Sequence, residues 1–456
     1  MNVIKILLIS CIFLLISNSF VLPNTILIPD NQTTIQAGID AASTNDTVLI
    51  AVNTYSGTGN VNLSVTGKVI KIIGQSGAGS TIIDCEDLND GFSIISSGSE
   101  VRGVTIQNAI NAINCGTSNP IIDSNIIKDN EHGILLDPEG SPNLFDNNYL
   151  NNTYGIAVNG GYISSESITW HNDNGEPYII LGDIAIDDNV SGNDLWLNIE
   201  PGVEIRFTSG TGLQFGYTAY NPGRLNAVGT PDSMIIFTSL SGLSGDWKGL
   251  YFPDRSDDHG KTSTMEYCIV ENAGQTGWGS EANIYCFNTS TPTISNCIIR
   301  NSSNDGIYLG GVGSPNITNT TFQDNGQFAI QMALNASPVH YGNIFINNGS
   351  TGIGIQGGST TISSNTWYYD NGEPYIILGD VILEDIIVSY DSWLNIQPGV
   401  EVRFTSGTGM KIGDDAYVPG RLNAVGTPDS MIIFTSESGL DGDCVRLQIL
   451  MHGLIV

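Results

Sequence analysis

A cluster of ionisable side chains within one short segment, residues 253–261 (PDRSDDHGK), has the composition of a catalytic or metal-binding loop. Its carboxylates and imidazole belong to Asp254, Asp257, Asp258 and His259. Ca²⁺ prefers carboxylate oxygens as ligands, and a carboxyl group or an imidazole in a cleft can transfer protons. The segment therefore supports two hypotheses: a Ca²⁺ site or acid–base cluster at the edge of the fold, or a solvated surface loop.

A second group of candidates joins a tryptophan to charged side chains and occurs twice, 197 residues apart. Its members are Trp196, Glu204, Arg206 and Arg224 in the first copy and Trp393, Glu401, Arg403 and Arg421 in the second. Alternation in VEIRF (residues 203–207) predicts that the apolar side chains point inward and the charges outward. An exposed tryptophan beside arginine donors can hold a sugar ring or a protein partner. Alternatively, the tryptophan covers a loop and the charges form surface ion pairs, which contribute little stability.

These candidates lie on a chain with a repeat of about 23 residues. Short β-branched segments such as VTIQNA, CIIRNS and TFQDNG carry an apolar residue that is followed two positions later by Asn or Asp. The apolar positions are Ile106, Ile127, Leu150, Val270, Ile299, Phe322 and Phe345, and the polar ones are Asn108, Asp129, Asn152, Asn272, Asn301, Asp324 and Asn347. Such a period predicts a solenoid in which strands of successive coils pair in parallel over a continuous apolar core. The Asn or Asp would turn each corner in a left-handed conformation and bond to the corner of the next coil.

With this repeat, the chain resembles the right-handed parallel β-helix proteins of the pectin-lyase-like superfamily. The segment TIQAGIDAASTNDTVLIAVNTYSG is similar to the N-terminal entry of that family. The resemblance implies an all-β, right-handed parallel β-helix solenoid with a short capping helix near residues 34–42 and a first strand at residues 47–52. The block LNIEPGVEIRF is similar to coils in many secreted bacterial β-helix proteins of unassigned activity.

The same superfamily includes polysaccharide lyases, hydrolases, methylesterases, tailspikes and adhesins, so the fold does not define the activity. The polygalacturonase-like pieces Asn-Thr-Asp, Gly-His-Gly and Arg-Ile-Lys are absent. Hydrolysis would need converging carboxylates, and a lyase would need a Ca²⁺ cage beside a basic residue; we see neither arrangement on a strand. We therefore expect a non-catalytic protein that binds polysaccharide or mediates surface contacts. The alternative is a carbohydrate-active enzyme, a lyase or hydrolase, acting on acidic glycans.

A longer repeat is superimposed on the short one, because the block PGRLNAVGTPDSMIIFTS occurs unchanged at residues 222–239 and 419–436. We divide the chain into a signal peptide (1–19), a cap with N-terminal coils (20–167), the first module copy (168–253), central coils (254–364), a truncated second copy (365–443) and an aberrant tail (444–456). Similarity between the copies ends at Cys444, where Trp247 stands in the first. This abrupt loss leads us to expect a frameshift or a truncated gene.

The N-terminus and the net charge indicate export. MNVIKILLISCIFLLISNSF reads as a secretory signal peptide, and apolar residues continue past Cys11, so a lipoprotein anchor at that cysteine is not expected. No other segment is long enough to span a membrane. The formal net charge of −31 repels nucleic acid. We expect a secreted or cell-surface bacterial protein with extracellular polysaccharide or surface components as partners, no required cofactor, and Ca²⁺ as the one candidate ion. Cys268 and Cys297 share a register position and are expected to stack as buried thiols.

Overall fold

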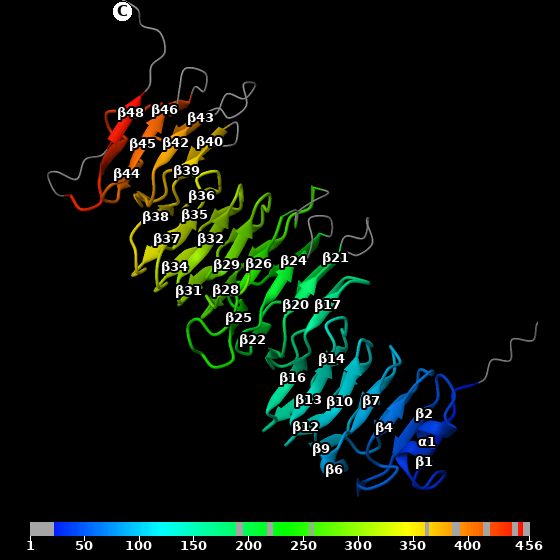
Figure 1. Ribbon diagram of the computed structural model, residues 1–456. Helices are drawn as coiled ribbons and strands as arrows, with labels where there is room; N and C mark the ends of the chain where they lie inside the picture. Colours follow the sequence, from blue (N-terminus) through cyan, green and yellow to red (C-terminus); the bar gives the residue numbers. More distant parts are fainter. Residues whose placement is uncertain are drawn as a thin grey trace, which may run out of the picture.

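The computed structural model describes residues 22–187, 195–216, 222–254, 256, 260–360, 364–384, 393–413, 420–439 and 446–449. Within them the chain winds as one elongated solenoid, whose coils follow one another along a single axis from the N-terminal to the C-terminal end (Figure 1). Every pair of neighbouring strands is parallel, which confirms the predicted parallel β-helix.

Three sheets contain the N-terminal strands. The 6-stranded sheet pairs β1 (Thr25–Ile28), β2 (Thr47–Ile50), β5 (Lys71–Gly74), β8 (Glu100–Arg102), β11 (Ile121–Asp123) and β14 (Asn143–Phe145). The 5-stranded sheet pairs β3 (Asn53–Tyr55), β6 (Thr81–Asn89), β9 (Thr105–Ala109), β12 (Ile126–Lys128) and β15 (Asn148–Leu150). The 12-stranded sheet extends furthest, with β4 (Leu63–Val65), β7 (Phe92–Ile94), β10 (Asn111–Gly116), β13 (His132–Leu136), β16 (Tyr154–Val158), β19 (Tyr178–Ile180), β22 (Glu204–Phe207), β25 (Ile235–Ser239), β28 (Cys268–Glu271), β31 (Ile298–Arg300), β34 (Thr321–Gln323) and β37 (Ile344–Ile346).

The remaining strands form four more sheets. The 11-stranded sheet contains β17 (Gly161–Ile163), β20 (Ile184–Ile186), β23 (Leu213–Phe215), β26 (Leu250–Phe252), β29 (Ala282–Phe287), β32 (Asp305–Gly310), β35 (Ile330–Met332), β38 (Ile353–Ile355), β41 (Tyr375–Ile377), β44 (Glu401–Phe404) and β47 (Ile433–Ser436). The 7-stranded sheet contains β18 (Ile168–Trp170), β21 (Leu195–Ile199), β24 (Gly223–Val228), β27 (Thr264–Glu266), β30 (Thr293–Ser295), β33 (Asn316–Thr318) and β36 (Val339–Tyr341). A 4-stranded sheet pairs β39 (Gly358–Ser359), β42 (Val381–Leu383), β45 (Gly409–Ile412) and β48 (Arg446–Ile449), and a 3-stranded sheet pairs β40 (Ser364–Trp367), β43 (Trp393–Ile396) and β46 (Arg421–Ala424).

The predicted capping helix is present as α1 (Ile35–Ala41), which closes the N-terminal end of the core. Thr34 is its N-cap and accepts a hydrogen bond from the N–H of Ala37, and Ile35 and Ile39 are buried. The predicted strand near residues 47–52 is β2. It is the second strand of its sheet, because β1 precedes the helix and pairs with β2 in register. No helix among the described residues has the length and apolar character needed to cross a bilayer.

Inward side chains repeat at the same strand positions and form one continuous apolar core. The alternation predicted for residues 203–207 is confirmed, because Val203, Ile205 and Phe207 are buried. Cys268 and Cys297 are also buried, as predicted, and are free thiols along with the other described cysteines, Cys85, Cys115 and Cys286. Burial raises the pKa of the Cys115 thiol, so it behaves as a small apolar side chain rather than as a reactive thiolate.

The corners follow the predicted Asn/Asp pattern, with one error of register. Positive φ angles between 49° and 66° occur at these predicted corners: Asn108, Asp129, Asn272, Asn301, Asp324 and Asn347. The prediction for Leu150 and Asn152 was wrong by one residue. Tyr149 pairs with Ile127, Leu150 is 43% exposed, and Asn151 takes the left-handed conformation. The segment 148–152 contains consecutive Asn residues, so sequence spacing alone could not fix which one turns the corner.

Asparagine residues that directly follow several left-handed corners build a buried ladder between coils. Asn325 accepts the N–H of Ser302 at 3.1 Å and donates Nδ2 to the carbonyl of Ile299 at 3.1 Å and to Asn348 Oδ1 at 2.9 Å. Asn125 and Asn130 form the equivalent contacts with Asn147 and Asn152. These amides satisfy backbone groups that the short corners would otherwise leave buried without a partner.

Each module copy begins where one sheet of the solenoid ends and a new sheet starts on another face. We describe this change as an advance of the cross-section by one face. At the first copy, Thr169 of β18 donates its N–H to Ser141 Oγ, just before β14, so the 7-stranded sheet continues the 6-stranded one. The 5-stranded sheet ends at β15, the 12-stranded sheet continues, and β17 starts a new sheet. At the second copy, Thr366 of β40 makes the same contact with Ser337 before β36, the 12-stranded sheet ends at β37, and β39 starts a new sheet.

We predict that Asn325→Ala lowers the free energy of unfolding by about 2 kcal/mol, because it leaves the Ser302 N–H and the Ile299 carbonyl buried without their partner. Denaturant titration followed by circular dichroism measures the change. The control Thr351→Ala removes an exposed side chain in the next coil and is expected to stay within about 0.5 kcal/mol of the parent. Equal stability of both variants would contradict a structural role for the ladder.

Candidate functional site

The acidic loop identified from the sequence is described only in part. Asp254 is half-buried, and its Oδ1 accepts hydrogen bonds from the N–H of Thr289 at 3.3 Å and from Thr289 Oγ1 at 2.7 Å. Asp257, Asp258 and His259 lie outside the described residues, so the proposed acid–base cluster stays a prediction. Among the residues that the structure describes, no group of three or more His, Cys, Asp or Glu side chains is arranged to hold a metal ion.

The predicted tryptophan–arginine pairs do form, but not as an open surface in the first copy. Trp196 and Arg224 are register partners on β21 and β24, and the Arg224 guanidinium lies 5.7 Å from the Trp196 ring centroid. Arg224 has 0% exposure and donates Nε to the Lys261 carbonyl at 3.3 Å, so the loop after β26 covers it. The expectation that Arg224 is an accessible donor was therefore wrong, because its outward-pointing side chain is covered by another segment of the chain.

The second copy repeats this pair with greater exposure. Trp393 and Arg421 are register partners on β43 and β46, the guanidinium lies 5.7 Å from the ring centroid, and Trp393 is 39% exposed.

The other four predicted binding residues lie on different faces from the tryptophans. Glu204 and Arg206 lie on β22 of the 12-stranded sheet and form an ion pair at 2.7 Å. Glu401 and Arg403 form the same pair at 2.9 Å on β44 of the 11-stranded sheet. The structure therefore does not assemble each predicted set into one binding surface, because a corner separates the tryptophan strand from the charged strand.

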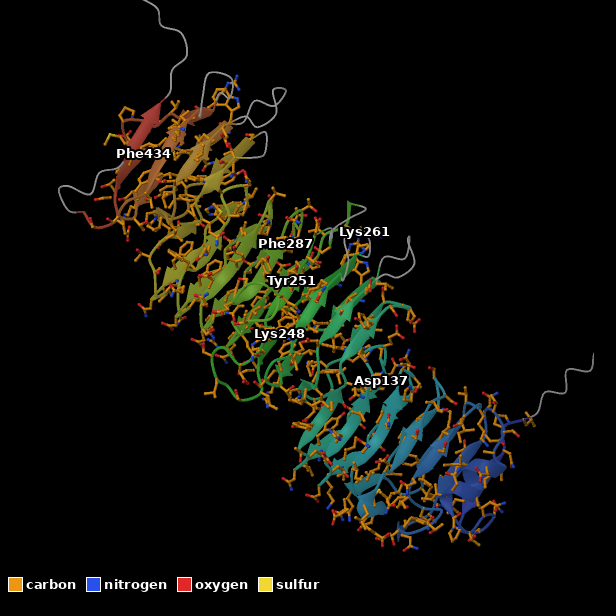
Figure 2. The ribbon with its side chains drawn as sticks, in the orientation of Figure 1. Asp137, Lys248, Tyr251, Lys261, Phe287 and Phe434 are labelled. Carbon is orange, nitrogen blue, oxygen red and sulfur yellow. The ribbon has the colours of Figure 1, made fainter. Side chains whose placement is uncertain are left out.

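A stronger candidate is a row of outward aromatic rings on the 11-stranded sheet, which sequence reasoning missed. Strand register places Tyr251, Tyr285 and Tyr308 side by side on β26, β29 and β32, and all three are half-buried. Tyr251 and Tyr285 stack with ring centroids 4.9 Å apart, and Tyr285 lies 5.4 Å from Tyr308. Figure 2 shows Tyr251 and its neighbours Lys248 and Phe287 on the same side of the solenoid.

Trp278 extends this row from the loop that joins β28 to β29. Its ring stacks on Tyr251 at 5.6 Å, and the Lys248 ammonium lies 5.7 Å from its centroid. Lys248 also forms an ion pair with Asp183 at 2.5 Å. Gly212 lies beneath the ring, since a Cβ there would come within 2.4 Å of Trp278. We call Trp278, Tyr251, Tyr285 and Tyr308 the aromatic platform.

Two hollows flank the aromatic platform along the axis of the solenoid. Hollow A has a volume of about 330 Å³, and its lining includes Tyr162, Asp183, Ala185, Gln214 and Trp278. Hollow B has a volume of about 320 Å³, and its lining includes Glu281, Asn304, Asp305, Tyr308, Gln331 and Gln356. Tyr308 Oη donates to Gln356 Oε1 at 3.0 Å, which fixes the orientation of both side chains. Apolar ring faces thus alternate with amides and carboxylates, as in surfaces that bind sugars.

Hollow B also contains a carboxyl group with an unusual environment. Asp305 is 2% exposed, and its Oδ1 accepts the N–H of Phe328 at 3.1 Å. Burial raises the pKa of Asp305 to about 7, the negative charge of Glu281 adds to the rise, and the Phe328 hydrogen bond opposes it. A carboxyl group that holds its proton near neutral pH can donate it, provided that it reaches the reacting atom.

A larger hollow than these two lies elsewhere, at the corners of the N-terminal coils. It has a volume of about 570 Å³, and half of its lining residues are Asp or Asn, namely Asp87, Asp129, Asn130 and Asn151. No aromatic ring lines it, and its side chains already serve the corner ladder. We therefore place the candidate site at the aromatic platform.

The sequence did contain a signal for the aromatic platform. Tyr251 follows Leu250, Tyr285 follows Ile284, and Tyr308 follows Ile307, so each tyrosine comes directly after an inward aliphatic residue of one sheet. Aligning the repeats by this inward residue would have placed the three tyrosines in one outward row. Alignment by the Asn or Asp corners did not reveal this row, because the number of residues between a corner and the following strand differs from coil to coil.

One family model agrees with the parallel β-helix fold. Residues 226–381 match the family model described as right handed beta helix region. The chain is similar to the catalytic domain of a GH87 alpha-1,3-glucanase variant in complex with tetrasaccharides, at 10% identity and a TM-score of 0.34, over 91% of this chain and 68% of that one. No curated protein sequence matches the chain. The resemblance to pectin-lyase-like β-helix proteins is confirmed for the fold.

We predict that Asp305→Asn flattens the dependence of stability on pH. Because the folded-state pKa of Asp305 is raised, its stabilising contribution is complete below about pH 4 and is lost as the pH rises through about 7. Asparagine keeps an acceptor for the Phe328 N–H but carries no charge, so the variant should lose less stability than the parent between pH 4 and pH 7.5. Denaturant titrations at several pH values measure this, and identical pH profiles would contradict the assignment.

Proposed function

We propose that this chain is an exported β-helix protein that binds polysaccharide on the outer face of its 11-stranded sheet and acts without catalysis. The observation that carries this proposal is the aromatic platform, where stacked rings are flanked by two hollows lined with polar side chains. Sugar rings have apolar faces that pack on aromatic rings, while their hydroxyl groups bond to amides and carboxylates. The signal-peptide-like N-terminus supports export to the place where polysaccharides are met.

The charges around the aromatic platform favour a neutral polysaccharide over a polyuronate. Asp183, Glu281 and Asp305 line the two hollows, and Lys248 is already paired with Asp183. The formal net charge of −31 adds a repulsive field for anionic polymers. Gln214, Gln331 and Gln356 supply uncharged donors and acceptors, which suit sugar hydroxyls.

We predict that Trp278→Ala and Tyr285→Ala each weaken polysaccharide binding at least tenfold, because each removes one stacking surface of the aromatic platform. Affinity electrophoresis in gels containing dextran, laminarin, xylan or polygalacturonate measures the retardation. We expect retention by one of the neutral polymers and none by polygalacturonate.

Trp393→Ala is the matched control, because it removes an exposed tryptophan from the face suggested by the sequence alone. Unchanged retardation of this variant supports the aromatic platform. Loss of binding in Trp393→Ala with full binding in Trp278→Ala would move the site to the tryptophan–arginine face. A parent protein that none of the polymers retards would refute the proposed function.

A second candidate function is hydrolysis of a glycosidic bond in hollow B. Asp305 carries a raised pKa there, and Glu281 is exposed beside it with its Oε1 accepting from Thr276 Oγ1 at 2.6 Å. In this reading Asp305 is the proton donor and Glu281 activates water or attacks the sugar. The near-complete burial of Asp305 and its bond to the Phe328 N–H instead suit a structural cap, so binding remains our first proposal.

Release of reducing ends from the retained polymer tests this second function. If hollow B is catalytic, the parent protein releases them and Glu281→Gln lowers the rate at least a hundredfold while retardation in the gel persists. Retention without new reducing ends in the parent protein would exclude hydrolysis of that polymer.

A further inference from the structure

The geometry points to a second sugar-binding hollow in the second module copy, so that we infer two-point attachment to one polysaccharide chain. We call it hollow A′. It has a volume of about 170 Å³, and its lining includes Asp380, Ile382, Gly407, Gly409, Met410 and Lys411. This inference rests on the proposed function. It adds a second binding site, which would make the protein bivalent for the polysaccharide.

Four lining positions of hollow A recur 197 residues later in the lining of hollow A′. Asp183, Ala185 and Gln214 of hollow A lie 197 positions before Asp380, Ile382 and Lys411. Strand pairing is also the same, because Ala185 is the register partner of Gln214 and Ile382 is the register partner of Lys411. The part of the hollow that Asp183, Ala185 and Gln214 line therefore belongs to the module and was copied with it.

The cross-section advances by one face between the two module copies, so hollow A and hollow A′ lie on different sheets. Hollow A lies on the sheet that begins at β17, and hollow A′ lies on the sheet that begins at β39. Each of these sheets starts at the same point of its module, directly after the sheet that continues through the boundary. In Figure 1, β42 and β45 lie further along the axis of the solenoid, in line with β26 and β29. A polymer lying along the axis can reach both hollows.

The chemistry of hollow A′ fits one pyranose ring. The half-buried Ile382 side chain and the glycine backbone offer an apolar surface for a ring face. The Asp380 carboxylate, held by the Gly409 N–H at 2.9 Å, offers an acceptor for ring hydroxyls, and Lys411 supplies a donor where hollow A has the Gln214 amide. Because Trp278 belongs to a loop of the central coils, it covers hollow A and not hollow A′, so hollow A′ binds without an aromatic lid and more weakly.

Two weak sites on one rigid solenoid increase the affinity for a polymer without any new contact. Once one hollow is occupied, the second binding event becomes intramolecular, with an effective concentration set by the fixed spacing of the two hollows. A short oligosaccharide cannot span them and gains nothing. We therefore expect the polymer to bind at least tenfold more tightly, per site, than its tetrasaccharide.

Calorimetric titration of the whole protein tests this inference. The probe is a tetrasaccharide prepared by partial hydrolysis of the neutral polymer that retards the protein. We expect two sites per chain in the parent protein and one site in Asp380→Ala, together with at least a tenfold loss of polymer affinity in that variant. Asp429→Ala, an exposed carboxylate at a corner of the same module, is the control and should retain two sites. Thermal melting followed by circular dichroism checks that both variants remain folded.

The outcomes separate this inference from the proposed function. One site in the parent protein, with polymer affinity unchanged in Asp380→Ala, would overturn hollow A′ and leave the aromatic platform as the binding site. Two sites in the parent protein that both persist in Asp380→Ala would place the second site elsewhere and would also overturn the assignment. Failure of every polymer to bind the parent protein would overturn both proposals together.

Discussion

The parallel hydrogen bonding of each coil to the next is the interaction on which the rest of this structure depends. Neighbouring strands lie about 4.8 Å apart, so a residue type at one strand position is stacked directly on the residue at the same position of the next coil. The pairing is parallel from β1 to β48, with shifts of register between β6 and β9 and between β10 and β13. Every other feature, whether inside, at the corners or on the outer face, is a row of side chains created by this stacking.

Inside the solenoid, side chains of similar shape stack on one another in successive coils, even where their residue types differ. Phe207 packs on Trp247 with ring centroids 4.0 Å apart, and Trp170 packs on Tyr178 at 5.2 Å. At the second module boundary, His340 is buried and lies within hydrogen-bond distance of Asp370 at 3.1 Å and of Tyr375 at 2.8 Å. That cluster resembles a catalytic arrangement in residue type. The His340 side chain is only 1% exposed, however, so the cluster is part of the core.

On the outer face the same stacking produces the candidate site. A tyrosine that follows an inward residue in three successive coils becomes an aromatic row, and one loop adds Trp278 to it. Duplication of a whole number of coils adds a module without disturbing its neighbours, because each coil contacts only the coils beside it. Here the copied module also advances the cross-section by one face, and hollow A′ accordingly lies on the sheet that begins at β39.

The sequence alone determined the parallel β-helix, the capping helix and most left-handed corners, because these depend on local patterns: strand alternation, an N-cap at Thr34, and Asn or Asp where φ is positive. It also placed Trp393 and Arg421 among the outward residues of one module copy, and the structure pairs these two. Only the tertiary structure decided that Arg224 is covered, that Glu204 lies on another face from Trp196, and that three tyrosines form one row. The physical reason is that the alternation of a strand fixes whether a side chain points inward or outward. Which other side chains lie beside it, and which loops cover it, depend on the number of residues that separate the strands of successive coils.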